Sequence, residues 1–517
     1  MEEIQVVLGL LVVVALIATV SRLVGMPYPI LMVIGGLLLG LVPGVPRVVL
    51  TPDLVLVIFL PPILFAAAYF TSLRDLRANV KQIGQLAFLL VLITMSAVAI
   101  VAHTLLPEIG WAAAFALGAI VAPPDAIAAT AIAQRVGLPR RAVVILEGES
   151  LVNDATALTA YRVAVAVAVG GSFTLGSAAV QLLVALGGGI AIGIAIGWVT
   201  VKIEGWLNDA PVETIVSLIA PFAAYLPAER LGVSGVLAAV SAGLMLGRFG
   251  PRVLTSQSRV LATSVWEMVV FLINSFVFVL IGLQLPLVVG STGRSLGEYV
   301  AIGLAVAVTV IVVRIAWIFA TTYGVSWLRR RGRTDRMPGW RGVAVLSWAG
   351  MRGSVTLAAA LALPVSPPFP GRSLILFSAF MVILATLVVQ GLTLPAVVRR
   401  LGVGGDTELG MEETRARQVT TEAALARLDG LRREWPGHIP LVDQLRERYE
   451  HRTEHVTADP ADEAADQELL EHRRIRHEVI EAERLAVIQL RDAGEISDNV
   501  LHRLERELDL EELRMEA

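Results

Sequence analysis

The chain has 517 residues, of which 56% are hydrophobic, with a mean hydropathy of +0.72 and a formal net charge of −3. This composition is too apolar for a soluble globular protein and is typical of a polytopic membrane protein. The chain contains no cysteine, which excludes disulfides and thiolate metal sites.

The first apolar run, Ile4 to Val20, follows Glu2 and Glu3, where a cleaved signal peptide would carry positive charge. We therefore expect a retained span here. Apolar runs long enough to cross a hydrocarbon core of ~30 Å recur down the chain and predict about 13 spans. Their expected limits are 4–21, 27–45, 53–72, 82–105, 111–134, 140–169, 175–203, 211–228, 233–249, 259–289, 297–328, 342–364 and 373–399. All should be helices, because open strands cannot satisfy their backbone in lipid.

The basic residues are distributed unequally between alternate loops. One set of loops carries 19 Lys and Arg residues and the opposite set carries only Arg47, Arg230, Arg294 and Arg372. By the positive-inside rule the richer set is cytoplasmic. This places the N-terminus outside and the C-terminus in the cytoplasm, in agreement with an odd number of spans.

The character of the chain changes after Leu401. Residues 406–517 hold 29 Asp and Glu, 16 Arg and no Lys, and apolar residues such as Leu485 and Ile488 recur there at helical spacing. We expect residues 1–401 to form a transmembrane exchange domain. Residues 402–517 are expected to form a cytoplasmic acidic helical tail, with a solvated acidic tail without further structure as the alternative.

The sixth span carries an acidic run, EGESLVND (147–154), in an otherwise apolar stretch. A charge at the bilayer centre costs at least ~2.5 kcal/mol, so such a group is expected to be paired, wet or functional. Burial disfavours the ionised form of a carboxylate, which lets Asp154 exchange a proton for a cation. Ser150 lies one turn earlier on the same helix face and supplies a second oxygen. The alternative is that Asp154 belongs to a structural ion pair.

Glu149 and Asn153 are also four residues apart, on an adjacent face. A buried Glu needs a partner, because an unpaired buried charge is far more costly than a paired one. Arg314, in the middle of the eleventh span, is the first candidate partner, and Arg352 is the alternative. Glu147 is expected either to line the path to the site or to be a solvated helix end. Glu213 and Glu229, near the ends of other spans, are expected to be solvated.

Two spans are interrupted in the middle. In the fifth, the prolines of APPD (122–125) break the helix, so Asp125 is expected beside the positive end of a half-helix. In the twelfth, the glycines of GMRGS (350–354) surround Arg352, which is expected to offset negative helix ends. Interruptions at corresponding positions of two halves indicate a midplane binding site in inverted-repeat transporters. Spans 1–6 and 8–13 would be those halves.

These motifs together resemble the bacterial Na+/H+ exchangers of the monovalent cation/proton antiporter 1 family. The matching segments run in order along most of residues 1–400: FLPPILF (59–65), VAPPDAIAA (121–129), EGESLVNDATAL (147–158), FVLIGLQL (278–285), WAGMRGSVTLA (348–358) and VVQGLTLP (388–395). EGESLVND is the most specific of them. Many members have Thr immediately before the residue numbered Asp125 here, whereas this chain has Pro124.

The resemblance implies a 13-helix fold with crossed broken helices, a mobile core and a dimerisation scaffold, and a homodimer. It implies that Asp154 is the carboxylate that binds the transported Na+ or a proton, with Ser150 nearby. It implies that Asn153 before Asp154 marks electroneutral exchange, that Glu149 is the ion-paired structural acid, and that Asp125 and Arg352 are the charges at the helix crossing.

The sequence thus predicts an all-α membrane protein of the prokaryotic plasma membrane that exchanges Na+ for H+ by alternating access, in pH and sodium homeostasis. K+ or Li+ are further candidate cations, and a K+/H+ antiporter of the same fold is one alternative. A cation channel gated by the tail and a symporter of an organic anion are alternatives from other classes. No enzymatic activity, cofactor or nucleic-acid partner is expected; two catalytic aspartates or zinc-ligand spacing, which an intramembrane protease needs, are not found.

Overall fold

The computed structural model describes residues 2–42, 54–125, 130, 138–170, 175–290, 295–324, 339–364, 369–403, 407–457, 463–493, 500–501, 504 and 507–512. Every regular element within these residues is a helix. The chain divides into two units, Met1–Asp406 and Thr407–Ala517.

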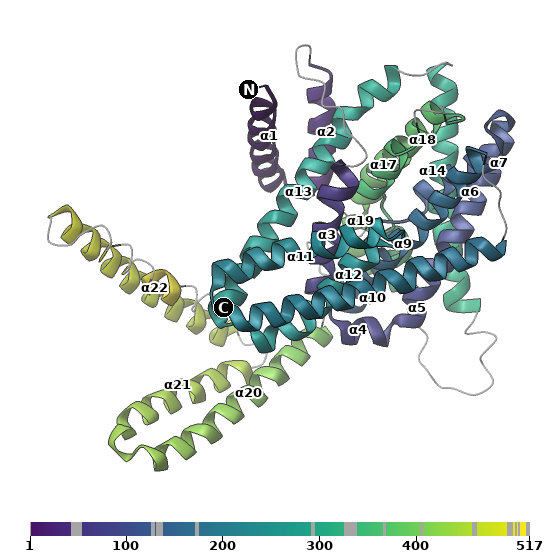
Figure 1. Ribbon diagram of the computed structural model, residues 1–517. Helices are drawn as coiled ribbons and strands as arrows, with labels where there is room; N and C mark the ends of the chain where they lie inside the picture. The colour runs from purple at the N-terminus through teal and green to yellow at the C-terminus, as the bar shows by residue number, and fades with distance from the viewer. Residues whose placement is uncertain are drawn as a thin grey trace. The chain divides into compact units, whose positions relative to one another are not determined.

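The elements of the first unit follow the predicted spans, and each of the thirteen contains at least one described helix (Figure 1). Up to the end of the sixth span the elements are α1 (Glu2–Val24), α2 (Tyr28–Gly40), η1 (Leu54–Phe59), α3 (Leu60–Phe70), α4 (Leu73–Ala78), α5 (Val80–Gly84), η2 (Gln85–Leu90), α6 (Val91–Leu105), η3 (Pro107–Ile109), α7 (Gly110–Val121) and α9 (Arg140–Ala168). Of these, α4 and η3 lie in connections between predicted spans. The later spans hold α10 (Leu175–Leu207), α11 (Ala210–Arg230), α12 (Gly235–Val253), α13 (Ser256–Gly290), α14 (Leu296–Phe319), η4 (Ala320–Gly324), α16 (Trp340–Trp348), α17 (Ser354–Leu361), α18 (Arg372–Ala385), η5 (Thr386–Gln390) and α19 (Gly391–Leu401).

Seven described helical stretches are long and apolar enough to cross a membrane by length and composition, and three shorter ones are apolar. The fifth and twelfth spans are interrupted as predicted, since α7 ends at Val121 and α16 is separated from α17 by residues 349–353. The remainder of the fifth span, 126–129 and 131–134, lies outside the described residues.

Local chemistry sets several helix ends. Asp209, Ser234 and Ser295 are N-caps whose side chains accept hydrogen bonds from the backbone N–H groups of Val212, Leu237 and Glu298, which satisfies donors that lack a partner within the helix. Gly402, with φ of 63°, ends α19 in the left-handed conformation that glycine adopts without strain.

The helices of the first unit pack as two groups. The scaffold group comprises α2, α3, α10, α11, α12 and α13, with α12 packed on both α3 and α10 and with α13 on α2. The core group comprises α6, α7, α9, α14 and the helices from α16 to α19, with α6 beside α7 and α14 beside α18. Contacts within each group are far more extensive than contacts between the two groups, so each group packs mainly within itself.

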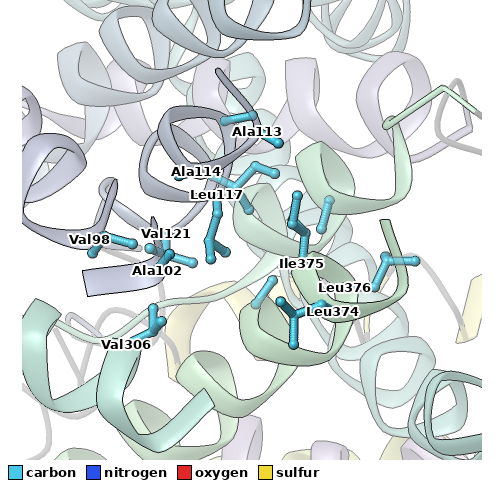
Figure 2. Packing of buried hydrophobic residues seen from close by; sticks show 14 of the residues in the cluster. Val98, Ala102, Ala113, Ala114, Leu117, Val121, Val306, Leu374, Ile375 and Leu376 are labelled. Atoms are coloured by element: carbon cyan, nitrogen blue, oxygen red, sulfur yellow. The ribbon is translucent and has the colours of Figure 1, made fainter. Parts of the chain in front are cut away.

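An apolar cluster holds the core group together (Figure 2). Val98 of α6, Leu117 of α7, Val306 of α14 and Ile375 of α18 all contribute, and none of these four side chains is exposed. Interdigitation of small and branched side chains lets these four helices approach closely. In lipid the hydrophobic effect does not drive helices together, because the lipid tails are as apolar as the side chains. Close packing of this kind drives helix association instead.

Within the scaffold group, Gly193 and Gly197 allow α10 to pack closely on α12. A Cβ added at Gly193 would collide with the backbone carbonyl of Ala238, and one at Gly197 would meet α12 at Ala242. Gly187, on the same helix, has no atom within 4 Å of such a Cβ. The seam between α10 and α12 therefore depends on Gly193 and Gly197 but not on Gly187.

Glu213 corrects a sequence-based expectation. It was expected to be solvated at a span end, but its side chain is only 2% exposed. The backbone N–H of Asp209 donates to Glu213 Oε1 at 3.1 Å, which turns the carboxylate back into the hairpin between α10 and α11. Glu229, by contrast, remains part-exposed and pairs with Arg162 at 2.6 Å.

The second unit is helical, as the sequence predicts. Its helices are α20 (Thr407–Glu434), α21 (Ile439–Thr457) and α22 (Glu463–Asp492), with α20 packed along α21. Arg484 donates to Asp509 and Glu512 at 2.8 and 2.9 Å, and its guanidinium holds the pKa of the Glu512 carboxyl below the usual range. These ion pairs are solvent-exposed, so each adds little stability.

The glycine seam generates a test. Replacing Gly193 by Leu should separate α10 from α12 and cost about 1–3 kcal/mol, the usual penalty for overpacking. Thermal unfolding of the purified protein in detergent would measure the loss. Gly187→Leu on the same helix is the matched control and should leave the unfolding temperature near that of the wild type; equal losses in both variants would refute the seam.

Candidate cation and proton site

Helix α9 carries the acidic motif on two faces. Glu147, Ser150 and Asp154 line one cavity of about 640 Å3, as their spacing of three and four residues predicts. Glu149 and Asn153 turn toward a neighbouring part of the bundle. A single helix thus presents one set of polar groups to a cavity and the other to protein.

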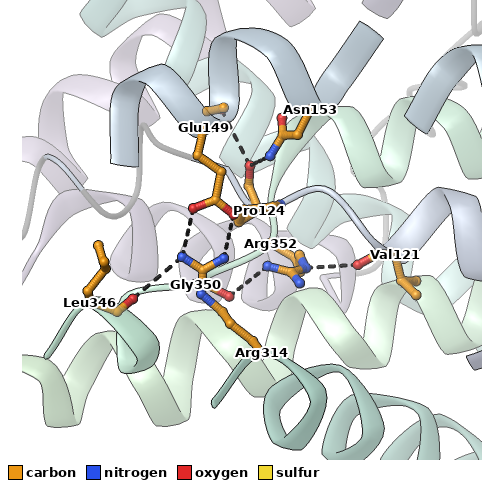
Figure 3. Close-up of polar contacts among 9 residues, drawn as sticks. Val121, Pro124, Glu149, Asn153, Arg314, Leu346, Gly350 and Arg352 are labelled. Atoms are coloured by element: carbon orange, nitrogen blue, oxygen red, sulfur yellow. Dashed lines mark hydrogen bonds and ion pairs between the residues drawn. The ribbon is translucent and has the colours of Figure 1, made fainter. Parts of the chain in front are cut away.

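The second face is fixed by a buried ion pair (Figure 3). Arg314 of α14 donates to both carboxylate oxygens of Glu149 at 2.6 and 2.9 Å, and the side chains are 1% and 0% exposed. Arg314 also approaches the Leu346 carbonyl at 3.5 Å. A Cβ at Gly350 would collide with the Arg314 side chain, so glycine at this position makes room for the pair.

The two interrupted spans cross beside this pair. The backbone N–H of Asp125 donates to the Met351 carbonyl at 2.7 Å, which joins the two unwound segments. The backbone N–H of Ser354, at the start of α17, donates to Asp125 Oδ2 at 3.1 Å. Asp125 thereby offsets the positive end of that half-helix. Gly353 leaves space for this carboxylate, since a Cβ there would collide with it.

Arg352 offsets the negative helix ends at the crossing. Its Nε donates to the Val121 carbonyl at 2.8 Å and its guanidinium donates to the Gly350 carbonyl at 2.9 Å (Figure 3). These carbonyls lie at the C-terminal ends of the broken helices, where the helix dipole is negative. Arg352 contacts these carbonyls rather than Glu149, so the partner of Glu149 in the structure is Arg314.

Asp154 differs from these charged groups. Its side chain is 3% exposed, and none of the ion pairs found in the described part of the chain includes it. The nearby charge that acts on it is that of Asp125, which repels a second negative charge. A buried carboxylate in such surroundings is costly in the ionised form. It therefore needs a proton or a cation.

Hydroxyl-bearing residues that could bind a small cation line the same cavity as Asp154. Ser150 accompanies it on α9, and Ser354 and Thr356 of α17 line the same cavity. The Ser354 hydroxyl is buried and has no hydrogen-bond partner among the described residues. Asn153 is held instead by Pro124, whose carbonyl accepts from Asn153 Nδ2 at 3.3 Å and from Ser150 at 3.4 Å.

The cavity lies between the two helix groups. The core group contributes α9 and α17, and the scaffold group contributes α3 together with Tyr28 of α2 and Asn274 of α13. The exposed Glu267 and the half-buried Glu147 also line it, so Glu147 faces the cavity and is not a fully solvated helix end. Thr71 donates to Glu147 Oε2 at 3.2 Å.

The sequence did not single out Tyr28, Asn274, Glu267, Ser354 or Thr356. Ser354 and Thr356 directly follow the interrupted segment GMRG, which was the available signal for them. Tyr28, Asn274 and Glu267 lie outside the sequence motifs, and only the packing of the scaffold group brings them to the cavity.

Comparisons with known proteins agree on one family. Residues 9–400 match the family model described as "Sodium/hydrogen exchanger, transmembrane". The chain is 40% identical to an uncharacterized Na(+)/H(+) exchanger of Mycobacterium tuberculosis over 98% of this chain and 96% of that protein. It is 29% identical to the sodium, potassium, lithium and rubidium/H(+) antiporter of Bacillus subtilis, over 99% of this chain and 78% of that protein.

The fold is similar to that of a solved structure. The sodium proton antiporter MjNhaP1 from Methanocaldococcus jannaschii superimposes with a TM-score of 0.59 at 19% sequence identity, covering 78% of this chain and 100% of that one. At this identity the likeness concerns the fold alone.

The ion pair of Glu149 and Arg314 generates a second prediction. Arg314→Met leaves Glu149 buried without a partner and should cost about 3–5 kcal/mol, seen as a large fall in unfolding temperature. Combining it with Glu149→Gln should restore part of the loss, because no lone charge then remains.

The exposed pair of Arg162 and Glu229 is the matched control. Arg162→Met should cost no more than about 1 kcal/mol, since that pair is screened by solvent. If Arg314→Met were as mild as Arg162→Met, the central role of the buried pair would be wrong.

Proposed function

The chain belongs to the sodium/hydrogen exchanger family, and from this premise we propose that it is an electroneutral Na+/H+ antiporter in which Asp154 binds either ion. The observation that carries the proposal is the buried Asp154 carboxylate in a cavity between two helix groups, without a cationic partner in the described residues. Its function is transport rather than catalysis.

The exchange follows from competition for one carboxylate. When Na+ binds, Asp154 loses its proton and its oxygens replace part of the hydration shell of the cation. When a proton binds, Asp154 becomes neutral and the cation leaves. The Na+-bound and the protonated forms of Asp154 are both neutral. The bare carboxylate, by contrast, would incur the penalty for a charge inside the membrane. One proton is thus exchanged for each Na+.

The remaining polar residues have distinct roles in this proposal. Ser150, Ser354 and Thr356 supply neutral oxygens next to Asp154. Asn153 carries no charge, so a single carboxylate of the ND pair titrates, which supports one-for-one exchange. Its amide is held by the Pro124 carbonyl and thereby orients the unwound segment of the crossing against α9.

The position of the cavity supports alternating access. Asp154, Asp125 and Arg352 all belong to the core group, and the opposite cavity wall belongs to the scaffold group. A displacement of the core group against the scaffold would carry Asp154 with both compensating helix ends. The many contacts within each group would stay intact, while the few contacts between the groups would change.

The choice of cation is a separate matter. The Bacillus subtilis relative is named as an antiporter of sodium, potassium, lithium and rubidium, which supports K+ and Li+ as further substrates here. Among the described residues that line the cavity, Asp125 and Asp154 are the buried carboxylates, Glu147 is half-buried and Glu267 is exposed, and hydroxyl and amide groups supply neutral oxygens. Such a set does not by its charge favour one monovalent cation over another.

The chain is a multi-pass membrane protein, and the plasma membrane of a prokaryote follows from its bacterial relatives. The 19 basic residues on one set of loops against four on the other support an N-terminus outside and a cytoplasmic C-terminus. We include a homodimer in the proposal because of the resemblance to the family.

Exchange in proteoliposomes tests the function. Na+ added outside should drive protons out, reported by an internal pH dye, and clamping the membrane potential at zero should not change the rate. Asp154→Asn should abolish exchange, because an amide cannot release a proton, while unfolding temperature and gel-filtration profile stay unchanged. The exposed residue Glu298 provides the control variant Glu298→Gln, which should exchange normally.

Each other outcome has a defined meaning. A response to K+ alone would make the protein a K+/H+ antiporter, and dependence on the potential would contradict one-for-one exchange. Cation flux without proton movement would favour a channel. Native exchange by Asp154→Asn would eliminate the mechanism.

Glu147 generates a further prediction. Its carboxylate lies two helical turns from Asp154, about 10 Å along the axis, where its charge should stabilise a bound cation by ~0.4–1.6 kcal/mol. Glu147→Gln should raise the Na+ concentration for half-maximal exchange about two- to tenfold with little effect on the maximal rate. Initial rates over a Na+ series would show it, and an unchanged half-maximal concentration would remove Glu147 from the path.

A further inference from the structure

A second group of buried acids lies in the hairpin between α10 and α11. Glu204 is in the last turn of α10 and Glu213 is in the first turns of α11, and both side chains are 2% exposed. One oxygen of Glu213 accepts the Asp209 N–H that caps α11. The second oxygen, Oε2, of both Glu204 and Glu213 is buried without a hydrogen-bond partner in the described part of the chain.

The surrounding charges do not neutralise the two acids. The other charged and titratable groups on α3, on α10 to α13 and in the hairpin are Tyr69, Lys202, Asp209, Tyr225, Glu229, Arg230, Arg248, Arg252, Arg259 and Glu267. Lys202 lies over an indole ring of its own helix at 5.8 Å, and Arg259 donates to a backbone carbonyl at 2.6 Å. Arg248 and Arg252 are exposed on α12. None of the ion pairs among the described residues includes Glu204 or Glu213.

Ionising Glu204 is costly because its carboxylate is buried and because the charge of Glu213 acts on it. We propose that Glu204 and Glu213 form a second proton-binding site, which holds one proton between them and lies outside the exchange cavity. Capping of α11 explains one oxygen of Glu213, but it leaves Glu204 and both Oε2 atoms without a structural role. A shared proton supplies the missing donor.

The site is connected to the exchange cavity through α3. Glu204 acts electrostatically on Tyr69 of that helix, and the neighbouring residues from Leu60 to Phe70 form the scaffold wall of the cavity. Loss of the shared proton at high pH would place two negative charges in the hairpin, and their mutual repulsion would disturb the packing of α11 on α3. The proton would therefore keep the cavity wall in place. The rate of exchange would fall as the pH rises on the side of the membrane where the hairpin lies. This consequence rests on the proposed function; the proton site itself does not.

The proton is tested without any transport. Infrared difference spectra of the full chain in lipid, recorded over a pH series, report the carbonyl stretch of protonated carboxyl groups. In an Asp154→Asn background the band should lose the contribution of one carboxyl when Glu204→Gln is added, whereas Glu298→Gln should not change it. Superimposable spectra with and without Glu204→Gln would overturn the proposal.

The pH profile of exchange tests the consequence. In the wild type the rate above the optimum should fall by up to about tenfold per pH unit, the limit for loss of one proton. Glu204→Gln mimics the protonated partner and should flatten that limb while the Na+ concentration for half-maximal exchange stays the same. Glu213→Gln should do likewise, because glutamine still accepts the Asp209 N–H. An unchanged profile together with an altered infrared band would leave the proton site intact and refute its coupling to exchange.

Discussion

The ion pair between Glu149 and Arg314 is the interaction on which the geometry of the site depends. Both charges are buried, so neither can turn to solvent without leaving the other alone at high cost. The bidentate contact therefore fixes the rotation of α9 about its axis. Because side chains four residues apart share a helix face, this rotation directs Ser150 and Asp154 into the cavity.

The helix crossing solves a second electrostatic problem. Broken helices leave partial charges inside the membrane, and each is met by a side chain of the opposite sign: Asp125 at the start of α17, and Arg352 at the carbonyls of Val121 and Gly350. These compensations are internal to the core group. Asp154 is not compensated in this way, and this difference separates a carboxylate that must bind an ion from carboxylates that stabilise the fold.

The absence of a compensating charge at Asp154 matters because of where Asp154 lies relative to the two helix groups. A buried acid inside one helix group would be enclosed by that group on all sides. Asp154 instead lies where the scaffold and core groups meet and where contacts are few. The hairpin acids Glu204 and Glu213 lie within the scaffold group, behind the wall that faces Asp154. Among the described residues, buried carboxylates without an ion-pair partner thus occur on the cavity, at Asp154, and in the hairpin, at Glu204 and Glu213.

Much of this protein could be predicted from its sequence because the bilayer restricts the alternatives. Hydropathy set the thirteen helical spans, since only helices satisfy their own backbone in lipid. Paired prolines and glycines located the interruptions at residues 122–125 and 349–353. The spacing of Ser150 and Asp154 placed them on one face. These are local properties, carried by neighbours along the chain.

Properties that depend on distant segments were decided only by tertiary structure. Two arginines were candidates for Glu149, and only the position of α14 within the core group, which places the Arg314 guanidinium 2.6 Å from the Glu149 carboxylate, selected Arg314. Tyr28 and Asn274 reach the cavity from positions outside the sequence motifs, and Glu213 was expected in solvent but is buried, with its carboxylate accepting the Asp209 N–H of the hairpin. Sequence determined which residues are costly in a membrane; the packing of remote helices determined which of them are neutralised by protein and which must bind an ion.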